Sequence, residues 1–184
     1  SAAVLTPSHQ YPTGSALDAA RRIQVIDWAR RTGAIIVEDD YDGELRYDRT
    51  PIGALAGLAP ESVIYVGSAS KTLSPAVRIA WLVLPPHLVG EVMHAKGIRE
   101  PDASIVDQLV FAEMIENGAY DRHIRSSRQH YRRRRDHLTR TLSAAGIDVR
   151  GIAAGLHAVI DVPADLETAV VAAARDRGFV VSGL

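Results

Sequence analysis

Short apolar runs separated by polar turns dominate the first half of the chain. The runs at 3–5, 34–37 and 63–66 are short and apolar, the middle one being rich in β-branched residues. The runs at 34–37 and 63–66 are typical of strands that a parallel sheet buries on both faces. Residues 79–84 form another run of this kind, and two prolines follow it. These runs predict several strands of one sheet.

An amphipathic helix is predicted between the first two strands. Ser15 is a plausible N-cap, the helix continues to about Arg31, and Gly33 would end it. Its expected apolar face consists of Leu17, Ala20, Ile23, Ile26 and Ala29. The order strand, helix, strand, connection, strand favours an α/β fold.

The second half of the chain is mainly helical. Its pattern predicts helices over 105–116 and 120–145, then a strand at 157–162, a helix at 164–177 and a strand at 179–181. The last three elements are typical of part of a smaller α+β unit. Both ends of the sequence look strand-like, so we expect both termini to be cut from a longer chain.

Composition excludes several classes of protein. The 184 residues are 47% hydrophobic, the net charge is −1 and there is no cysteine. This balance gives no general attraction to nucleic acid or to an anionic membrane, and it removes disulfides and thiol chemistry. No apolar run approaches the roughly 20 residues of a membrane span. We therefore expect a cytoplasmic protein without a membrane partner.

Candidate chemistry gathers where the predicted strands end. The loop 8–14, the acidic segment 39–41 and the turn 68–71 each follow a strand. Ligands of open α/β sheets bind beyond the carboxyl ends of the strands, so these segments should meet at one crevice. Lys71 could form an imine with an aldehyde cofactor if Arg78 and the crevice lower its pKa.

The acidic segment could hold the ring of such a cofactor. Asp39 or Asp40 could keep a proton on a pyridine nitrogen, and Tyr41 could donate a hydrogen bond to the ring's phenolate oxygen. An acidic, solvated turn or a weak cation site is an equally good interpretation of this segment taken alone. Calcium is a poor fit, because further spaced ligands are missing.

The turn after the third strand could hold a phosphate. Ser68 and Ser70 offer hydroxyl groups, and Arg78 offers a permanently charged, bidentate clamp. An amine, a carboxylate, a phenol and a phosphate clamp together are what pyridoxal phosphate (PLP) requires.

The succession of these motifs resembles a known family, the aminotransferase-like domain of MocR-type regulators. These regulators are a branch of the GntR transcription factors, in which a winged helix-turn-helix precedes a domain similar to class I aminotransferases. The resemblance covers nearly the whole chain and rests on residues 6–14, 38–47, 66–75 and 155–157.

The resemblance implies a PLP-dependent transferase fold of type I. Residues 1–97 would be the C-terminal portion of the PLP-binding large domain, and residues 98–184 would be linking helices and part of the small α+β domain. It also implies a homodimer, an amino compound as ligand, and DNA binding only through a winged helix upstream of Ser1. The phosphate-cradling turn and the stacking aromatic residue would also lie upstream of Ser1, and the carboxylate-binding arginine downstream of Leu184.

The resemblance further implies roles for individual residues. Lys71 would carry PLP as the internal aldimine, Asp39 would pair with the pyridine nitrogen and Asp40 would point away. The resemblance also makes Tyr41 the partner of the phenolate oxygen, and Ser68 and Arg78 phosphate ligands. Tyr11 stands where ordinary aminotransferases have an asparagine that touches the ring oxygen.

Two functions follow, and a third possibility stays open. The first is a regulator that senses an amino compound through an external aldimine. The alternative is a genuine class I aminotransferase that transfers an amino group to a keto acid. The third is a remnant that binds no cofactor.

Arginines and histidines crowd residues 122–140 without indicating a second site. An apolar stripe on the same helix favours packing on one face, with arginines covering the other, over contact with DNA. The seven histidines show no metal-ligand spacing, so no zinc site is expected.

Overall fold

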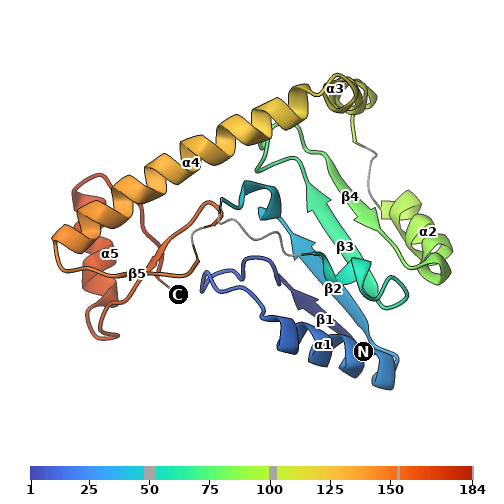
Figure 1. Cartoon of the computed structure of the whole chain (residues 1–184), viewed down its shortest axis with the longest axis horizontal. Helices are drawn as coiled ribbons and strands as arrows, with labels where there is room; N and C mark the ends of the chain where they lie inside the picture. Colours follow the sequence, from blue (N-terminus) through green and yellow to red (C-terminus); the bar gives the residue numbers. More distant parts are fainter. Residues whose placement is uncertain (48–52, 100–102, 153, 184) are drawn as a thin grey trace.

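A four-stranded sheet forms the centre of the molecule (Figure 1). The computed structural model describes residues 1–47, 53–99, 103–152 and 154–183. The strands β1 (Ala2–Leu5), β2 (Ile35–Asp40), β3 (Val63–Ser68) and β4 (Ala80–Val83) lie in this order. β1, β2 and β3 are parallel, so their carboxyl ends share one edge of the sheet. The predicted α/β class with a mainly parallel sheet is confirmed.

The strand β4 differs from what its apolar run suggested. It pairs antiparallel with β3, and Leu82 and Val83 are exposed. The connection 69–79 contains no helix, whereas a parallel partner would need a crossover of a dozen or more residues, usually with a helix. The expectation of a strand buried on both faces is therefore wrong for this run.

The helix α1 (Ala19–Thr32) begins later than expected and buries a different stripe. Asp18, not Ser15, is the N-cap, and its carboxylate accepts a hydrogen bond from the Arg21 amide at 2.8 Å. The buried residues are Arg22, Ile26 and Ala29, while Ile23 is 59% exposed. Gly33 ends the helix, as predicted, in the left-handed conformation with φ 64°.

The main core lies between α1 and the sheet. It consists of Ile26, Ala29, Ile36, Leu55, Ala59 and Val63. Leu55 belongs to a 3₁₀ helix, η2 (Leu55–Gly57), whose first amides are bound by a buried acid. Both oxygens of Glu38 accept hydrogen bonds from the amides of Leu55 and Ala56, at 2.9 and 3.0 Å. Burial raises the pKa of Glu38, and the two amides oppose that shift.

The remaining elements link the sheet to a C-terminal unit. Two of them are 3₁₀ helices, η1 (Gly43–Leu45) and η3 (Pro86–Leu88). The helices α2 (Val89–Arg99), α3 (Ile105–Glu116) and α4 (Ala119–Ala144) lead to the C-terminal unit. This unit consists of the antiparallel pair β5 (Val149–Arg150) and β6 (Val159–Ile160) and the helix α5 (Glu167–Asp176). Figure 1 shows α4 running from α3 beside the sheet to α5 at the other end. The predicted helices at 105–116 and 120–145 are confirmed within one residue.

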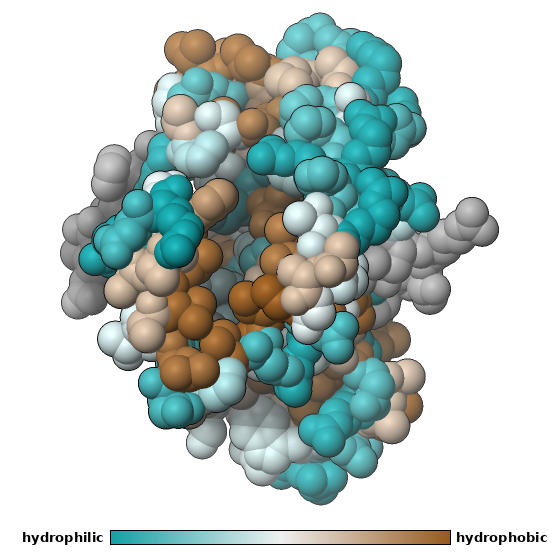
Figure 2. Space-filling model, turned by 90° about the vertical axis from the view of Figure 1, so that its left-hand side faces the viewer, coloured by the Kyte–Doolittle hydropathy of each residue, from teal (hydrophilic) through white to brown (hydrophobic). Residues whose placement is uncertain are grey.

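The C-terminal unit contains less strand than expected. Of the predicted strand 157–162, only residues 159–160 form a strand. The strand predicted at 179–181 is absent, so the prediction for these three residues is wrong. Phe179 and Val180 are instead exposed, by 66% and 96%. Figure 2 faces the side of the molecule that carries α5 and shows apolar surface around a recess. The division between residues 97 and 98 falls within α2 and stays a prediction.

The helices are not of the membrane-spanning kind. Across the part of the chain that the structure describes, none is both long enough and apolar enough to cross a bilayer.

Candidate functional site

A pocket of about 680 Å³ opens at the carboxyl ends of β1 and β2. Its walls come from the end of β1, the loop after it, the end of β2, the turn after β3 and a segment near the C-terminal unit. The lining residues are Val4, Leu5, Thr6, Gln10, Tyr11, Asp39, Tyr41, Lys71, Leu156 and His157. The crevice predicted at the strand ends is therefore present.

The structure brings four of the predicted site residues together. Tyr11, Asp39, Tyr41 and Lys71 all line the pocket. The sheet register explains part of this, because Asp39 pairs with Val66, shortly before the turn that carries Lys71. An amine, a carboxylate and a phenol from distant parts of the sequence thus face one space.

The neighbouring carboxylate, Asp40, is directed elsewhere. One of its oxygens accepts a hydrogen bond from the Tyr65 hydroxyl at 2.9 Å. Its carboxylate also fills the space beside Gly43, where a Cβ atom would lie 2.2 Å from an Asp40 oxygen. Successive side chains of a strand point to opposite faces. Of the two acids that the sequence left open, Asp39 is the one that faces the pocket.

Asp39 sits in surroundings that disfavour its charge. Burial raises the pKa of this carboxyl, and the negative charges of Asp40 and Asp42 raise it further. A cation placed against Asp39 would relieve this repulsion. The pocket therefore presents a carboxylate suited to a positively charged ring nitrogen.

Tyr41 is held as a hydrogen-bond donor. Its hydroxyl donates to the carbonyl oxygen of His9 at 3.2 Å. Burial raises the pKa of Tyr41 well above its usual value, and Asp42 adds to this effect. The phenol therefore keeps its proton at neutral pH, and this one proton would have to leave the His9 carbonyl to reach an anionic oxygen in the pocket.

The residues predicted to bind phosphate do not line the pocket. The Ser68 hydroxyl donates to the Ile79 carbonyl at 3.4 Å and accepts from the Ser70 amide at 3.1 Å. Arg78 is exposed and adopts a left-handed backbone conformation with φ 53°, which is unfavourable for a residue with a Cβ atom. Ser68 ends β3, while Ser70 and Arg78 lie in the connection to β4, and none of the three lines the pocket.

A comparison of the whole sequence with protein families identifies this arrangement. The family described as "Aminotransferase class I and II" matches residues 1–183. The chain belongs to this family. Pyridoxal phosphate is the cofactor that this membership and the related solved structures indicate.

The relatives include regulators as well as enzymes. The HTH-type transcriptional regulator YhdI of Bacillus subtilis is 38% identical over 96% of this chain and 39% of its own length. The HTH-type pyridoxine biosynthesis transcriptional regulator PdxR of Corynebacterium glutamicum is 36% identical over 100% of this chain and 40% of its own length. The chain thus spans about two fifths of the length of these curated relatives. The predicted resemblance to MocR-type regulators is confirmed, and PdxR is a further regulator that the chain resembles.

Solved aminotransferase structures share the fold. The α-aminoadipate aminotransferase LysN of Thermus thermophilus, complexed with N-(5'-phosphopyridoxyl)-L-leucine, superposes with a TM-score of 0.87 and 25% identity. The match covers 96% of this chain and 47% of that one. The predicted fold type I is confirmed.

The donor set of the pocket fits the family cofactor. Lys71 would supply a primary amine for the aldehyde, Asp39 a carboxylate for the ring nitrogen and Tyr41 a hydroxyl for the ring oxygen. When bound, PLP supplies an electrophilic carbon and an electron-accepting ring. The roles of these residues, like those of Tyr11, Ser68, Ser70 and Arg78, stay predictions.

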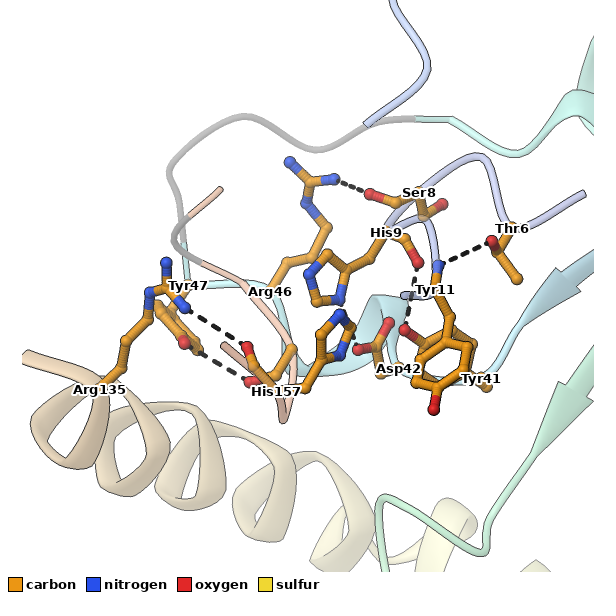
Figure 3. A network of polar contacts seen from close by, with 11 residues as sticks. Thr6, Ser8, His9, Tyr11, Tyr41, Asp42, Arg46, Tyr47, Arg135 and His157 are labelled. Carbon is orange, nitrogen blue, oxygen red and sulfur yellow. Dashed lines mark hydrogen bonds and ion pairs between the residues drawn. The ribbon is translucent and has the colours of Figure 1, made fainter. Parts of the chain in front are cut away.

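An imidazole without a predicted role also lies on the pocket wall. His157 lines the pocket, stacks on His9 with ring centroids 4.3 Å apart, and meets the edge of the Tyr11 ring (Figure 3). Burial and the neighbouring His9 lower the pKa of His157, so its ring is neutral at pH 7. In the sequence, His157 stood out only as part of the motif at 155–157, and that motif suggests no chemical role until the fold places His157 at the pocket.

His9 is buried and bonded within the structure. It is 2% exposed, and its Nδ1 lies 2.7 Å from an Asp42 oxygen. Among the described residues, His9, Asp42 and His157 form a cluster whose nitrogen and oxygen atoms lie within 4.8 Å of one another. Three separate segments supply this cluster, so sequence spacing could not have revealed it. The stacked rings and the existing hydrogen bond make it a brace for the pocket.

Two arginines tie the first loop to the rest of the fold. The buried guanidinium of Arg22 donates to the carbonyls of Pro7 and Leu17, both at 2.9 Å. Arg46 donates to the carbonyl of Ser8 (Figure 3). Because these bonds flank His9, they fix the loop that carries the Tyr11 side of the pocket.

Proposed function

We propose that this chain is the PLP-binding, aminotransferase-like part of a MocR/GntR-type transcriptional regulator that senses an amino compound through an external aldimine. The observation that carries the proposal is the convergence of Lys71, Asp39 and Tyr41 on one pocket. The HTH-type regulators among its relatives, such as YhdI and PdxR, support the regulatory part.

Each residue would have a definite chemical task. The carboxylate of Asp39 would hold a proton on the ring nitrogen, and Tyr41 would orient the ring through its phenolate oxygen. The amine of the ligand would then replace Lys71 on the aldehyde carbon. Lys71 would be released as a free amine in this exchange, which involves no redox change.

Sensing would require two conformations that bind the ligand differently. A ligand shifts such an equilibrium only by its difference in affinity for the two states. Release of Lys71, together with new contacts on the Leu156 and His157 side, would supply that difference. The large and small domains, divided near residue 97, would be the parts that move.

DNA would bind elsewhere in the full-length protein. We propose that a winged helix preceding these residues contacts the operator, that two copies form a homodimer, and that the regulator works in the cytoplasm.

The alternative is a class I aminotransferase, which the likeness to LysN favours. Robust transfer of an amino group from an amino acid to a keto acid would favour that alternative over a sensor.

Removal of the amine at Lys71 tests the proposal, and the sequence offers a matched control. Lys71 and Lys96 are its two lysines. In the full-length protein, Lys71→Ala should abolish the absorbance band that forms on mixing with PLP, because the covalent bond to the cofactor is lost. Lys96→Ala lies on α2, away from the pocket, and should keep the band. A band that survives Lys71→Ala, or one that is absent from the unmodified protein, overturns the proposal.

A further inference from the structure

The first turns of α4 form hydrogen bonds to the turn that carries Lys71. Thr72, the next residue, is buried at 5% exposure although Lys71 itself is exposed. Tyr120 and His123 reach Thr72 from the same face of α4, since they are three residues apart. A helix from a distant part of the sequence therefore contacts the backbone next to the candidate lysine.

The first of these contacts is a hydroxyl network. The Tyr120 hydroxyl lies 3.0 Å from the Thr72 hydroxyl and donates to the carboxylate of Glu44. Tyr120 is 8% exposed, and burial keeps its pKa well above the usual value, so the phenol stays protonated. Glu44 lies in η1, just after the strand end that carries Asp39 and Tyr41. The network thus joins the Lys71 turn to the opposite side of the candidate site.

The second contact holds the backbone directly. His123 Nε2 lies 2.7 Å from the carbonyl oxygen of Thr72 and can donate to it. The turn is closed on itself by a hydrogen bond from the Leu73 amide to the Ala69 carbonyl at 2.9 Å. Thr72, the residue that follows Lys71, is therefore held through both its side chain and its backbone carbonyl.

Aromatic packing fixes Tyr120 relative to the sheet. Its ring meets Phe111 edge-on at 5.1 Å, and Phe111 stacks on Trp81 of β4 at 6.1 Å. Trp81 in turn fills the space above Gly67, where a Cβ atom would lie 2.3 Å from the indole. This continuous row of rings leaves the Tyr120 hydroxyl little freedom of position.

We infer that Tyr120 and His123 are positioning residues, which aim the amine of Lys71 at the aldehyde of the cofactor by fixing the peptide after it. The four-carbon stem of lysine is flexible, but it starts from the Cα–Cβ bond, so the backbone at Lys71 limits which part of the pocket the amine can reach. Covalent capture of an aldehyde needs that amine in one place, whereas non-covalent binding of the same ring does not. The inference rests on the proposed function, and it predicts an effect on covalent binding alone.

The test compares two ligands in the full-length protein. PLP can bond to Lys71, whereas pyridoxamine phosphate has an amine in place of the aldehyde and cannot. Tyr120→Phe removes the hydroxyl and keeps the ring, and we expect it to weaken PLP binding about tenfold, the effect of one or two lost hydrogen bonds. The affinity of Tyr120→Phe for pyridoxamine phosphate should stay within about twofold of that of the unmodified protein.

Two further variants act as controls. Tyr131→Phe makes the same chemical change on α4, where the ring packs on His130 at 5.8 Å, and it should leave both affinities unchanged. His123→Leu should repeat the effect of Tyr120→Phe, and His123→Gln, which keeps a donor, should restore part of the PLP affinity.

Each outcome decides the question. Selective loss of PLP affinity supports the inference. Equal loss for both ligands would mean that the network merely maintains the pocket, and no loss for either would mean that it is dispensable; both results overturn the inference. If the unmodified protein shows no absorbance band that depends on Lys71, the proposed function fails first and this inference falls with it.

Discussion

The two sides of the candidate site are built in different ways. On the ring side, Asp39 and Tyr41 lie at the end of a central parallel strand, and the His9–Asp42 pair braces the loop opposite them. On the phosphate side, Ser68 bonds to its own turn, while Arg78 is exposed and outside the pocket lining. One side is assembled by the sheet, and the other depends on a turn.

The difference shows what a parallel sheet can fix without a ligand. Neighbouring strands have a definite register, so side chains at their ends are placed as soon as the strands pair. A turn beyond the sheet has no such constraint, and a mobile guanidinium can be ordered by the anion that it binds. We therefore expect the ring side to respond to changes in packing and the phosphate side to changes in charge.

The largest effect should come from a methyl group placed into the brace. In Gly155→Ala the new Cβ would lie 2.2 Å from an Asp42 oxygen and 2.3 Å from His9 Nδ1, in a backbone with φ 67°. The steric clash and the left-handed backbone together should lower the free energy of unfolding by about 3 kcal/mol. Urea denaturation of the full-length protein measures this loss.

A second glycine separates the clash from the backbone effect. Gly146 also has a positive φ, 75°, but a Cβ there meets no atom within 4 Å. Gly146→Ala should cost only about 1 kcal/mol. Equal losses for the two variants would contradict the role of the His9–Asp42 brace.

Asp39→Asn should lower the affinity for PLP and raise the stability of the cofactor-free protein. Loss of a charge-assisted hydrogen bond should reduce PLP affinity about 10-fold to 100-fold, as measured by absorbance titration. Folding raises the pKa of Asp39, so its contribution to stability is full below its usual pKa of about 4 and is lost as pH rises through the raised value. The asparagine variant lacks that loss, so without PLP it should melt at a higher temperature than the unmodified protein at pH 7.

The adjacent acid provides the comparison for this variant. Asp40 bonds to Tyr65 and does not line the pocket, so Asp40→Asn should leave PLP affinity within about twofold. A loss of PLP affinity in Asp40→Asn as large as in Asp39→Asn would show that the assignment of the ring partner is wrong.

Among the variants that change the site itself, Gly155→Ala, Asp39→Asn and Arg78→Ala, the last should have the smallest effect. Removal of an exposed cation should weaken PLP binding about tenfold, through lost attraction to the phosphate. Pyridoxal has the same aldehyde and ring but no phosphate, so its affinity should not change. An equal loss for both ligands would mean that Arg78 supports the turn and does not bind the anion.

Residue pattern alone predicted most of the elements and the residues of the ring side. The apolar runs placed β1, β2 and β3 correctly because short apolar runs between polar turns indicate strands, although Val4 of β1 is 71% exposed. Helices 105–116 and 120–145 were clear for a similar reason, since their apolar positions recur at helical spacing and Gly118 and Gly146 follow them. The end of β2 then pointed to Asp39 and Tyr41.

Predictions that depended on competition between similar residues were less successful. Ser15 and Asp18 are both good N-caps, and only the packing of Ile26 and Ala29 on the sheet selected the start of α1. Arg22 could not be predicted as buried, because its charge is tolerated only where the Pro7 and Leu17 carbonyls meet it.

The sequence by itself determined the alternation of strands and helices, the family and the amine, carboxylate and phenol of the ring side, since each depends on local pattern or on residue type. Tertiary structure alone decided that Asp39 faces the pocket in place of Asp40, that His9, Asp42 and His157 meet, and that Tyr120 reaches the Lys71 turn. These features join residues up to 148 positions apart, from His9 to His157. Contacts of this kind depend on strand register and on helix packing, which no local pattern records.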